Sequence, residues 1–173
     1  KIIFTLMLYG YYDFAFFTLL KSKQNKIFTE EDFTIVKKSI EMIYKIAENE
    51  LKYVDFYDNY SKLIKLGIYE DTLNREKLIP LLRFNSFKSP KNYLSLDKYV
   101  SNMKSNQSLI YYLTGVDNES LSKSPFIENI ISNGYDVLYL TDPIDEYMIQ
   151  HIRDYDGKKL LDVSKEGIKF NEY

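Results

Sequence analysis

The chain has 173 residues and a formal net charge of −2, which is enough sequence for one domain, or two small ones, with a real core. Its charge is balanced, and no basic stretch alternates with aromatic residues, so the pattern of a nucleic-acid-binding domain is excluded. The sequence contains no cysteine, which also excludes disulfides, thiolate zinc sites and cysteine nucleophiles.

The first segment, residues 1–27, differs in character from the rest of the chain. Residues 1–20 are mainly apolar and aromatic, and Gly10 and Asp13 interrupt them near the middle. A membrane span needs roughly 20 apolar residues, but an aspartate near its middle is costly in lipid. A signal peptide is another alternative, although no small-residue cleavage pattern follows. We expect a packed segment and no membrane contact.

Residues 28–104 have the pattern of a helical connector. Thr29 and the three acids after it predict a helix that ends near Asn49. A second, shorter helix is predicted over residues 51–63, because Gly67 interrupts the pattern. Pro80 predicts either a kinked helix or short turns. Residues 85–92 are predicted to form a loop, and Ser95 to cap a further helix. The apolar stripe of the first helix comprises Phe33, Val36, Ile40, Ile43, Tyr44 and Ala47.

The hydrophobic period changes in residues 105–173. Short runs rich in strand-forming residues alternate there with helical segments, and the links between them are short. Such alternation predicts parallel strands joined by right-handed crossovers. We therefore predict the α/β class, with a small α/β/α subdomain built on a three-stranded parallel sheet. The predicted strands cover residues 109–114, 137–141 and 160–163.

Few residues in this subdomain indicate a catalytic or metal-binding role. Asp142, Asp145 and Glu146 could together form a site for a hard metal ion, but capping of the helix over residues 144–153 explains all three. His151 is the only histidine, and no partner for it is evident from the sequence. No catalytic, cofactor or metal motif occurs. A stand-alone small α/β enzyme that uses Asp142 and His151 is the alternative hypothesis.

Several stretches, in family order and with family spacing, make the chain resemble the heat-shock protein 90 family. They include Ile64–Asp71 (IKLGIYED), Leu81–Phe84 (LLRF), Ser95–Val100 (SLDKYV), Ile110–Gly115 (IYYLTG), Ser124–Phe126 (SPF), Thr141–Tyr147 (TDPIDEY) and Lys165–Gly167 (KEG). The resemblance covers residues 36–170 and matches the later part of the middle domain. It implies a helical connector followed by a small α/β/α subdomain, in agreement with the pattern above.

The resemblance also implies a function. The family is an ATP-driven, homodimeric chaperone whose ATP and Mg²⁺ bind in another domain. Its middle domain donates an arginine to the γ-phosphate, and that position aligns here with Leu19. We therefore expect no catalytic or cofactor-binding residue and no complete ATPase site in this chain. Residues 1–24 depart from the family pattern, either as a divergent segment or as read-through of an intron or a wrong frame.

The resemblance places client contact at Asp145, Glu146 and Tyr147, where an amphipathic ring lies beside two acids. Packing of Tyr147 under its own helix is the competing interpretation. The expected partners are partly folded client proteins and co-chaperones, with no nucleic acid. Residues 82–84 and 165–170 are closer to the family branch of the endoplasmic reticulum, so we expect the reticulum lumen, with the cytoplasm as the alternative.

Overall fold

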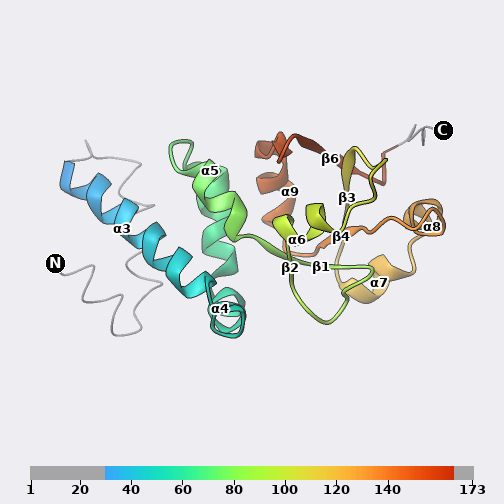
Figure 1. Ribbon diagram of the computed structural model, residues 1–173, viewed down its shortest axis with the longest axis horizontal. Helices are drawn as coiled ribbons and strands as arrows, with labels where there is room; N and C mark the ends of the chain where they lie inside the picture. Colours follow the sequence, from blue (N-terminus) through green and yellow to red (C-terminus); the bar gives the residue numbers. More distant parts are fainter. Residues whose placement is uncertain (1–29, 166–173) are drawn as a thin grey trace. The chain divides into compact units, whose positions relative to one another are not determined.

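The computed structural model describes residues 30–165, which divide between Leu81 and Leu82 into two compact units (Figure 1). The expectations for residues 1–27, including the alignment at Leu19, lie outside the described residues. Within residues 30–165, no helix combines the length and the apolar character that crossing a bilayer requires. The first unit is helical, and the second contains the sheet and the predicted client-contact residues.

The helical unit contains α3 (Glu30–Ala47), α4 (Glu50–Glu70), α5 (Arg75–Leu78) and the 3₁₀ turn η1 (Ile79–Leu81). The end of α3 agrees with the sequence prediction. Ile40 and Ile43 of its predicted stripe are buried, whereas Tyr44 is 38% exposed. The Tyr44 hydroxyl donates a hydrogen bond to the Lys77 carbonyl oxygen at 2.7 Å, so α3 is tied to α5. Of the two alternatives predicted for Pro80, the structure has the short helical turns.

The prediction for α4 was wrong in its length, because the helix runs through Gly67 to Glu70. A glycine inside a helix costs roughly 1 kcal/mol relative to alanine. Burial of one helix face outweighs that cost, since Tyr53, Tyr57 and Ile64 have almost no exposed surface. The last turn is also stabilised from outside, because Arg75 Nε donates to the Ile68 carbonyl oxygen at 2.7 Å.

The second unit is built on a mixed sheet with the strand order β2-β1-β4-β3-β6-β5. Its centre confirms the prediction, because β3 runs parallel to both of its neighbours, β4 and β6. The strands are β1 (Arg83–Ser86), β2 (Leu94–Ser95), β3 (Leu109–Thr114), β4 (Leu138–Leu140), β5 (Asp154–Tyr155) and β6 (Lys158–Asp162). The predicted three-stranded sheet was therefore too small, and the antiparallel strands β1, β2 and β5 extend it.

The missed strands gave weak sequence signals. β1 alternates polar residues with Phe84 and leads into a loop rich in serine and lysine, so its pattern predicted a loop. β5 has two residues and is joined to β6 by Asp156 and Gly157, both with positive φ. An Asp-Gly pair of this conformation is a typical hairpin turn. Residues 82–104 consequently belong to the sheet unit, whereas the sequence placed them in the helical connector.

Three helices of the second unit begin at N-cap residues, and the one at Ser95 was predicted from the sequence. Ser95, Asp117 and Ser124 each accept a backbone hydrogen bond as N-caps of α6 (Leu96–Ser101), α7 (Asn118–Ser122) and α8 (Pro125–Ser132). The predicted helix over residues 144–153 is shorter, with α9 (Asp145–Met148) continuing as the 3₁₀ turn η2 (Ile149–His151). A core cluster between strands and helices comprises Tyr111, Leu113, Leu121, Ile127, Ile130, Val137, Tyr139 and Val163.

Candidate functional site

The start of α9 is organised by Asp145. Its Oδ2 accepts a hydrogen bond from the Asp142 backbone nitrogen at 3.0 Å, and its own backbone nitrogen donates to the Asp142 carbonyl oxygen at 2.9 Å. The sequence explained Asp142, Asp145 and Glu146 by capping of this helix, and the Asp145 carboxylate has such a role, because the turn through Pro143 and Ile144 brings it back over the Asp142 amide. Asp145 therefore fixes how α9 leaves β4.

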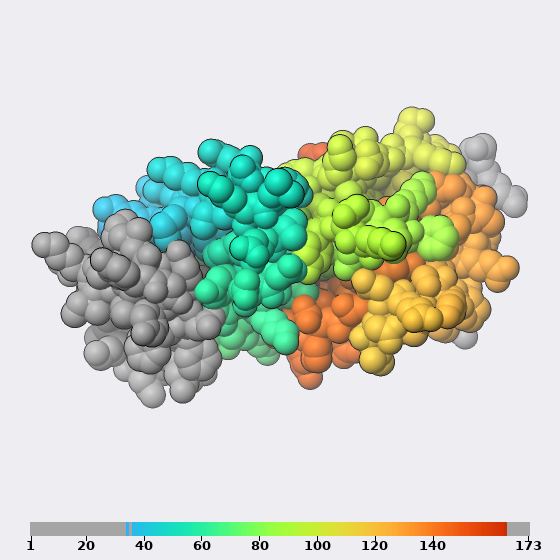
Figure 2. Space-filling view, turned by 90° about the horizontal axis from the view of Figure 1, so that it is seen from below, coloured from blue at the N-terminus to red at the C-terminus, as the bar shows by residue number. Residues whose placement is uncertain are grey.

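The three residues predicted to contact clients have different environments. Asp145 is only 1% exposed, so its side chain does not reach a partner. Glu146 is exposed, and Tyr147 is 56% exposed. Figure 2 shows the α9 segment, in dark orange, at the surface of its unit. The interpretation in which Tyr147 packs under its own helix is therefore not supported.

The backbone that carries Tyr147 is held firmly. Met148 is fully buried and Ile149 is 7% exposed, so the turn that presents Tyr147 is anchored from below. On the exposed side, Gln150 Nε2 donates to the Glu146 carbonyl oxygen at 2.8 Å. A tyrosine ring offers apolar area together with a polar tip, and few torsions must be fixed when it binds. Glu146 and Tyr147 thus form a small exposed surface on a firmly held turn, and because contact was predicted there we call it the α9 contact surface.

The structure gives little support to the alternative hypothesis of a catalytic site at Asp142 and His151. Both side chains are half-buried, and both interact with neighbouring residues. Neither of them lines the cavity described below. Over residues 30–165, no three histidine, aspartate or glutamate side chains gather in a way that could hold a metal ion. The geometry gives no basis for catalysis by this pair.

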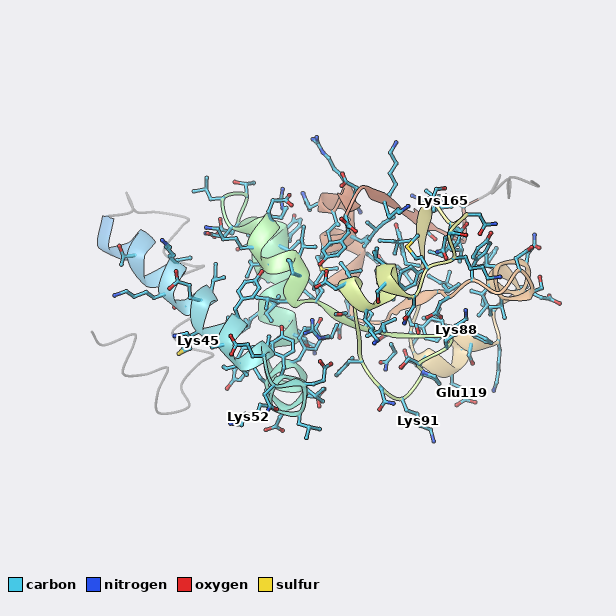
Figure 3. All side chains as sticks on the ribbon, viewed as in Figure 1. Lys45, Lys52, Lys88, Lys91, Glu119 and Lys165 are labelled. Carbon is cyan, nitrogen blue, oxygen red and sulfur yellow. The ribbon has the colours of Figure 1, made fainter. Side chains whose placement is uncertain are left out.

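A cavity of about 260 Å³ lies in the sheet unit beside α6. Its polar lining includes Lys88, Lys98, Tyr99, Lys104, Gln107 and Asp136. Lys88, labelled in Figure 3, comes from the loop between β1 and β2, and its Nζ donates to the Gly134 carbonyl oxygen at 2.7 Å. Lys104 Nζ donates to the Asn133 carbonyl oxygen, also at 2.7 Å. Both lysines thus neutralise the carbonyl end of α8, where cations are favoured.

Tyr99 lines this cavity, and its hydroxyl connects two neighbouring segments of the sheet unit. Gly115 N–H donates to the Leu140 carbonyl in the parallel β3–β4 ladder. Four residues earlier on each strand, the same pattern would join Tyr111 N–H to the Asp136 carbonyl. The Tyr99 hydroxyl stands between these two groups, since it accepts from Tyr111 N at 3.1 Å and donates to Asp136 O at 2.7 Å. One side chain therefore replaces a missing ladder hydrogen bond.

Burial raises the pKa of two tyrosines in this region. Desolvation raises the pKa of Tyr99 far above its ordinary value, and it raises the pKa of Tyr139 to about 12. Hydrogen bonds from Tyr111 N–H and Gln107 Nε2 oppose the shift at Tyr99 only in part. Both hydroxyls stay neutral at physiological pH, but only that of Tyr99 is part of a hydrogen-bond network, because the buried Tyr139 hydroxyl makes no hydrogen bond with residues 30–165.

This network was not predicted from the sequence. A helix after Ser95 was predicted, but nothing in the sequence indicated that the hydroxyl of Tyr99 would bridge β3 and the segment before β4. Gln107 and Asp136 lie in loops, where polar residues are ordinary. Their partners are 8 and 37 residues away from them, and a local pattern carries no signal for such distant pairs.

Comparison with known proteins shows which family of proteins this chain is similar to. The family model described as "Hsp90 protein" matches residues 21–173. Heat shock protein 83 of Leishmania donovani is 45% identical over 87% of this chain, and this match covers 33% of that protein. An endoplasmin homolog of Hordeum vulgare is 42% identical over 80% of the chain and 20% of its own length. The chain thus spans a third or less of these relatives.

A solved structure has the same fold. The middle domain of a heat shock protein of Plasmodium falciparum matches with a TM-score of 0.74 and 35% identity. The match covers 78% of this chain and 57% of that one. The helices and the mixed sheet described above are therefore those of a middle domain.

Proposed function

The chain belongs to the Hsp90 protein family, and from this membership we propose that it serves as part of the middle domain of an ATP-dependent molecular chaperone. The α9 contact surface carries the proposal, because it presents a half-exposed aromatic ring next to an exposed carboxylate on a firmly anchored turn. Such a surface suits loose contact with partly folded chains, which expose apolar and basic groups.

Within this proposal, the three predicted residues have two roles. Glu146 and Tyr147 contact the client directly. Asp145 is a positioning residue, because its buried carboxylate holds the Asp142 amide and so sets the direction in which α9 presents the ring. An enzyme that uses Asp142 and His151 has no observation in its favour, and the relatives are named as heat shock proteins and endoplasmin homologs.

The proposed parent protein is a homodimer that binds ATP and Mg²⁺ outside residues 30–165 and works with co-chaperones. This chain relays the nucleotide cycle to the client. The proposed location is the endoplasmic reticulum lumen, in line with the endoplasmin homologs among the relatives. The similarity to heat shock protein 83 leaves the cytoplasm as the second candidate.

A binding titration tests the proposed contact. The full chain is titrated with a fluorescently labelled, reduced and carboxymethylated client, and the dissociation constant is compared for the wild type, Tyr147→Ala and Glu146→Gln. We expect Tyr147→Ala to weaken binding by about tenfold, equivalent to roughly 1.4 kcal/mol. Glu146→Gln should produce a smaller loss that disappears at high salt, because an exposed charge is screened.

A matched control separates this surface from general apolar attraction. Phe126 on α8 is 54% exposed, which nearly equals the exposure of Tyr147 in the same unit. Phe126→Ala should leave the dissociation constant unchanged. If Phe126→Ala and Tyr147→Ala weaken binding equally, or if neither does, α9 is not the client-contact surface.

A further inference from the structure

The sequence contains three Asn-x-Ser triplets, which begin at Asn59, Asn106 and Asn118. This triplet is the acceptor motif for N-linked oligosaccharides, provided that proline does not occupy its middle position. The motif is short and arises often by chance. A usable acceptor must also lie where a bulky, hydrated glycan can project into solvent without displacing the folded chain.

The structure disfavours two of the three triplets. Asn118 is half-buried at the start of α7, and its Nδ2 donates to Asn85 Oδ1 at 3.0 Å. A sugar bonded to that nitrogen would push α7 away from β1. Asn59 is exposed, but it lies in the middle of the helix α4 and not in a turn, and its Nδ2 donates to the Asp55 carbonyl oxygen at 2.8 Å.

Asn106 has the surroundings that an acceptor needs. It occupies a turn closed by a hydrogen bond from Gln107 N to Lys104 O at 2.9 Å, and both Asn106 and Ser108 are exposed. The amide of Asn106 makes no hydrogen bond with any residue that the structure describes. Gln107 between them points inward, is 5% exposed and donates to the Leu109 carbonyl at 2.7 Å. The turn is thereby held with its two motif residues facing solvent.

We propose that Asn106 carries an N-linked oligosaccharide in the folded protein. The donor is a lipid-pyrophosphate-linked oligosaccharide of the reticulum membrane. A bond forms between Asn106 Nδ2 and the anomeric carbon of the first sugar, the bond from that carbon to the pyrophosphate oxygen breaks, and Nδ2 loses a proton. No oxidation or reduction is involved. The proposal rests on the proposed lumenal location, because this transfer occurs on the lumenal side.

The glycan would stand at the rim of the cavity beside α6, because Lys104 and Gln107 line that cavity. A hydrated oligosaccharide there would restrict access of other macromolecules to this part of the unit. It would leave the folded core unchanged, since Asn106 makes no packing contribution that the modification would remove.

The test places the full 173-residue chain behind a cleavable secretory leader in eukaryotic cells. Peptide-N-glycosidase treatment and mass spectrometry then report the occupancy of each asparagine. We expect one electrophoretic step that disappears in Asn106→Gln and Ser108→Ala and persists in Ser108→Thr. Asn118→Gln, and Asn92→Gln at an exposed asparagine outside any triplet, should leave this step in place.

The possible outcomes distinguish failure of the proposed glycosylation site from failure of the proposed lumenal location. The proposal is overturned if the chain reaches the lumen and Asn106 is unmodified. It is also overturned if the soluble folded fraction carries the glycan on Asn118. The parent protein, isolated from its own cells, gives the second measurement. A protease-protected, lumenal parent without a glycan at Asn106 also overturns the proposal. A cytosolic parent refutes the lumenal location and, with it, modification in the cell, whereas chaperone activity would be unaffected.

Discussion

Replacement of Tyr99 by phenylalanine tests how the sheet unit is held together. The Tyr99 ring is 2% exposed, and its hydroxyl makes three hydrogen bonds: it donates to Asp136 O and accepts from Tyr111 N and Gln107 Nε2. Phenylalanine keeps the ring and removes only the oxygen. The substitution therefore isolates the network from the packing around it.

The expected loss of stability in Tyr99→Phe depends on which hydrogen-bonding groups lose their partner. Gln107 Nε2 keeps its hydrogen bond to the Leu109 carbonyl at 2.7 Å, so it contributes little. Tyr111 N–H and the Asp136 carbonyl lose the group that joins them, and each buried group left without a partner costs about 1–3 kcal/mol. Water can reach the half-buried Asp136 in part, so we expect Tyr99→Phe to lower the free energy of unfolding by about 2–4 kcal/mol.

Urea unfolding followed by far-UV circular dichroism measures this change, and exchange of the Tyr111 amide proton locates it. Tyr112 on the same strand is the matched control, because it is 8% exposed and its hydroxyl bonds to none of residues 30–165. Tyr112→Phe should cost less than about 0.5 kcal/mol. Equal effects of the two substitutions, or unchanged protection of the Tyr111 amide in Tyr99→Phe, would refute the bridging role of the Tyr99 hydroxyl.

Three further predictions concern the cap, the buried tyrosines and nucleotide turnover. Asp145→Ala should lower the free energy of unfolding in urea by about 1–2 kcal/mol, because the Asp142 amide loses its acceptor; an unchanged midpoint would contradict the assigned cap. Stability should fall above pH 10 by about 1.4 kcal/mol per pH unit for each buried tyrosine, because unfolding frees Tyr99 and Tyr139 to ionise at their ordinary pKa. Tyr99→Phe should reduce this slope, and a slope equal to that of the wild type would count against burial as its cause. The purified chain should release no phosphate from ATP above background, and nucleotide-specific turnover in a coupled assay would contradict that expectation.

Strong local signals were sufficient to predict the centre of the fold. The buried run at residues 137–140 and the cap at Ser95 each depend on neighbours within a few residues, and the structure places both elements as expected. The α/β class followed from their order along the chain.

The outer strands could not be found in this way. β1 has only Phe84 as a strong apolar signal, and it is stabilised by antiparallel pairing with β4, more than 50 residues later. The length of α4 was missed for a related reason, because burial of its tyrosines compensates for Gly67, and local propensity does not reveal burial.

The candidate site was predicted in part. The sequence located the turn after β4 but could not distinguish Asp145, which is buried and positions the helix start, from Glu146 and Tyr147, which are exposed. All three are polar or amphipathic and adjacent in sequence. Their separation depends on the short α9 turn, whose rotation about its axis is set by the buried Met148 and Ile149.

The most direct test of client contact at α9 is a residue-resolved NMR titration of the isotopically labelled full chain with an unfolded client. We expect the amide signals of Glu146, Tyr147 and Gln150 to shift progressively, while those around Phe126 on α8 stay in place. Saturable shifts centred on another element, with the α9 signals unchanged, would contradict client contact at α9.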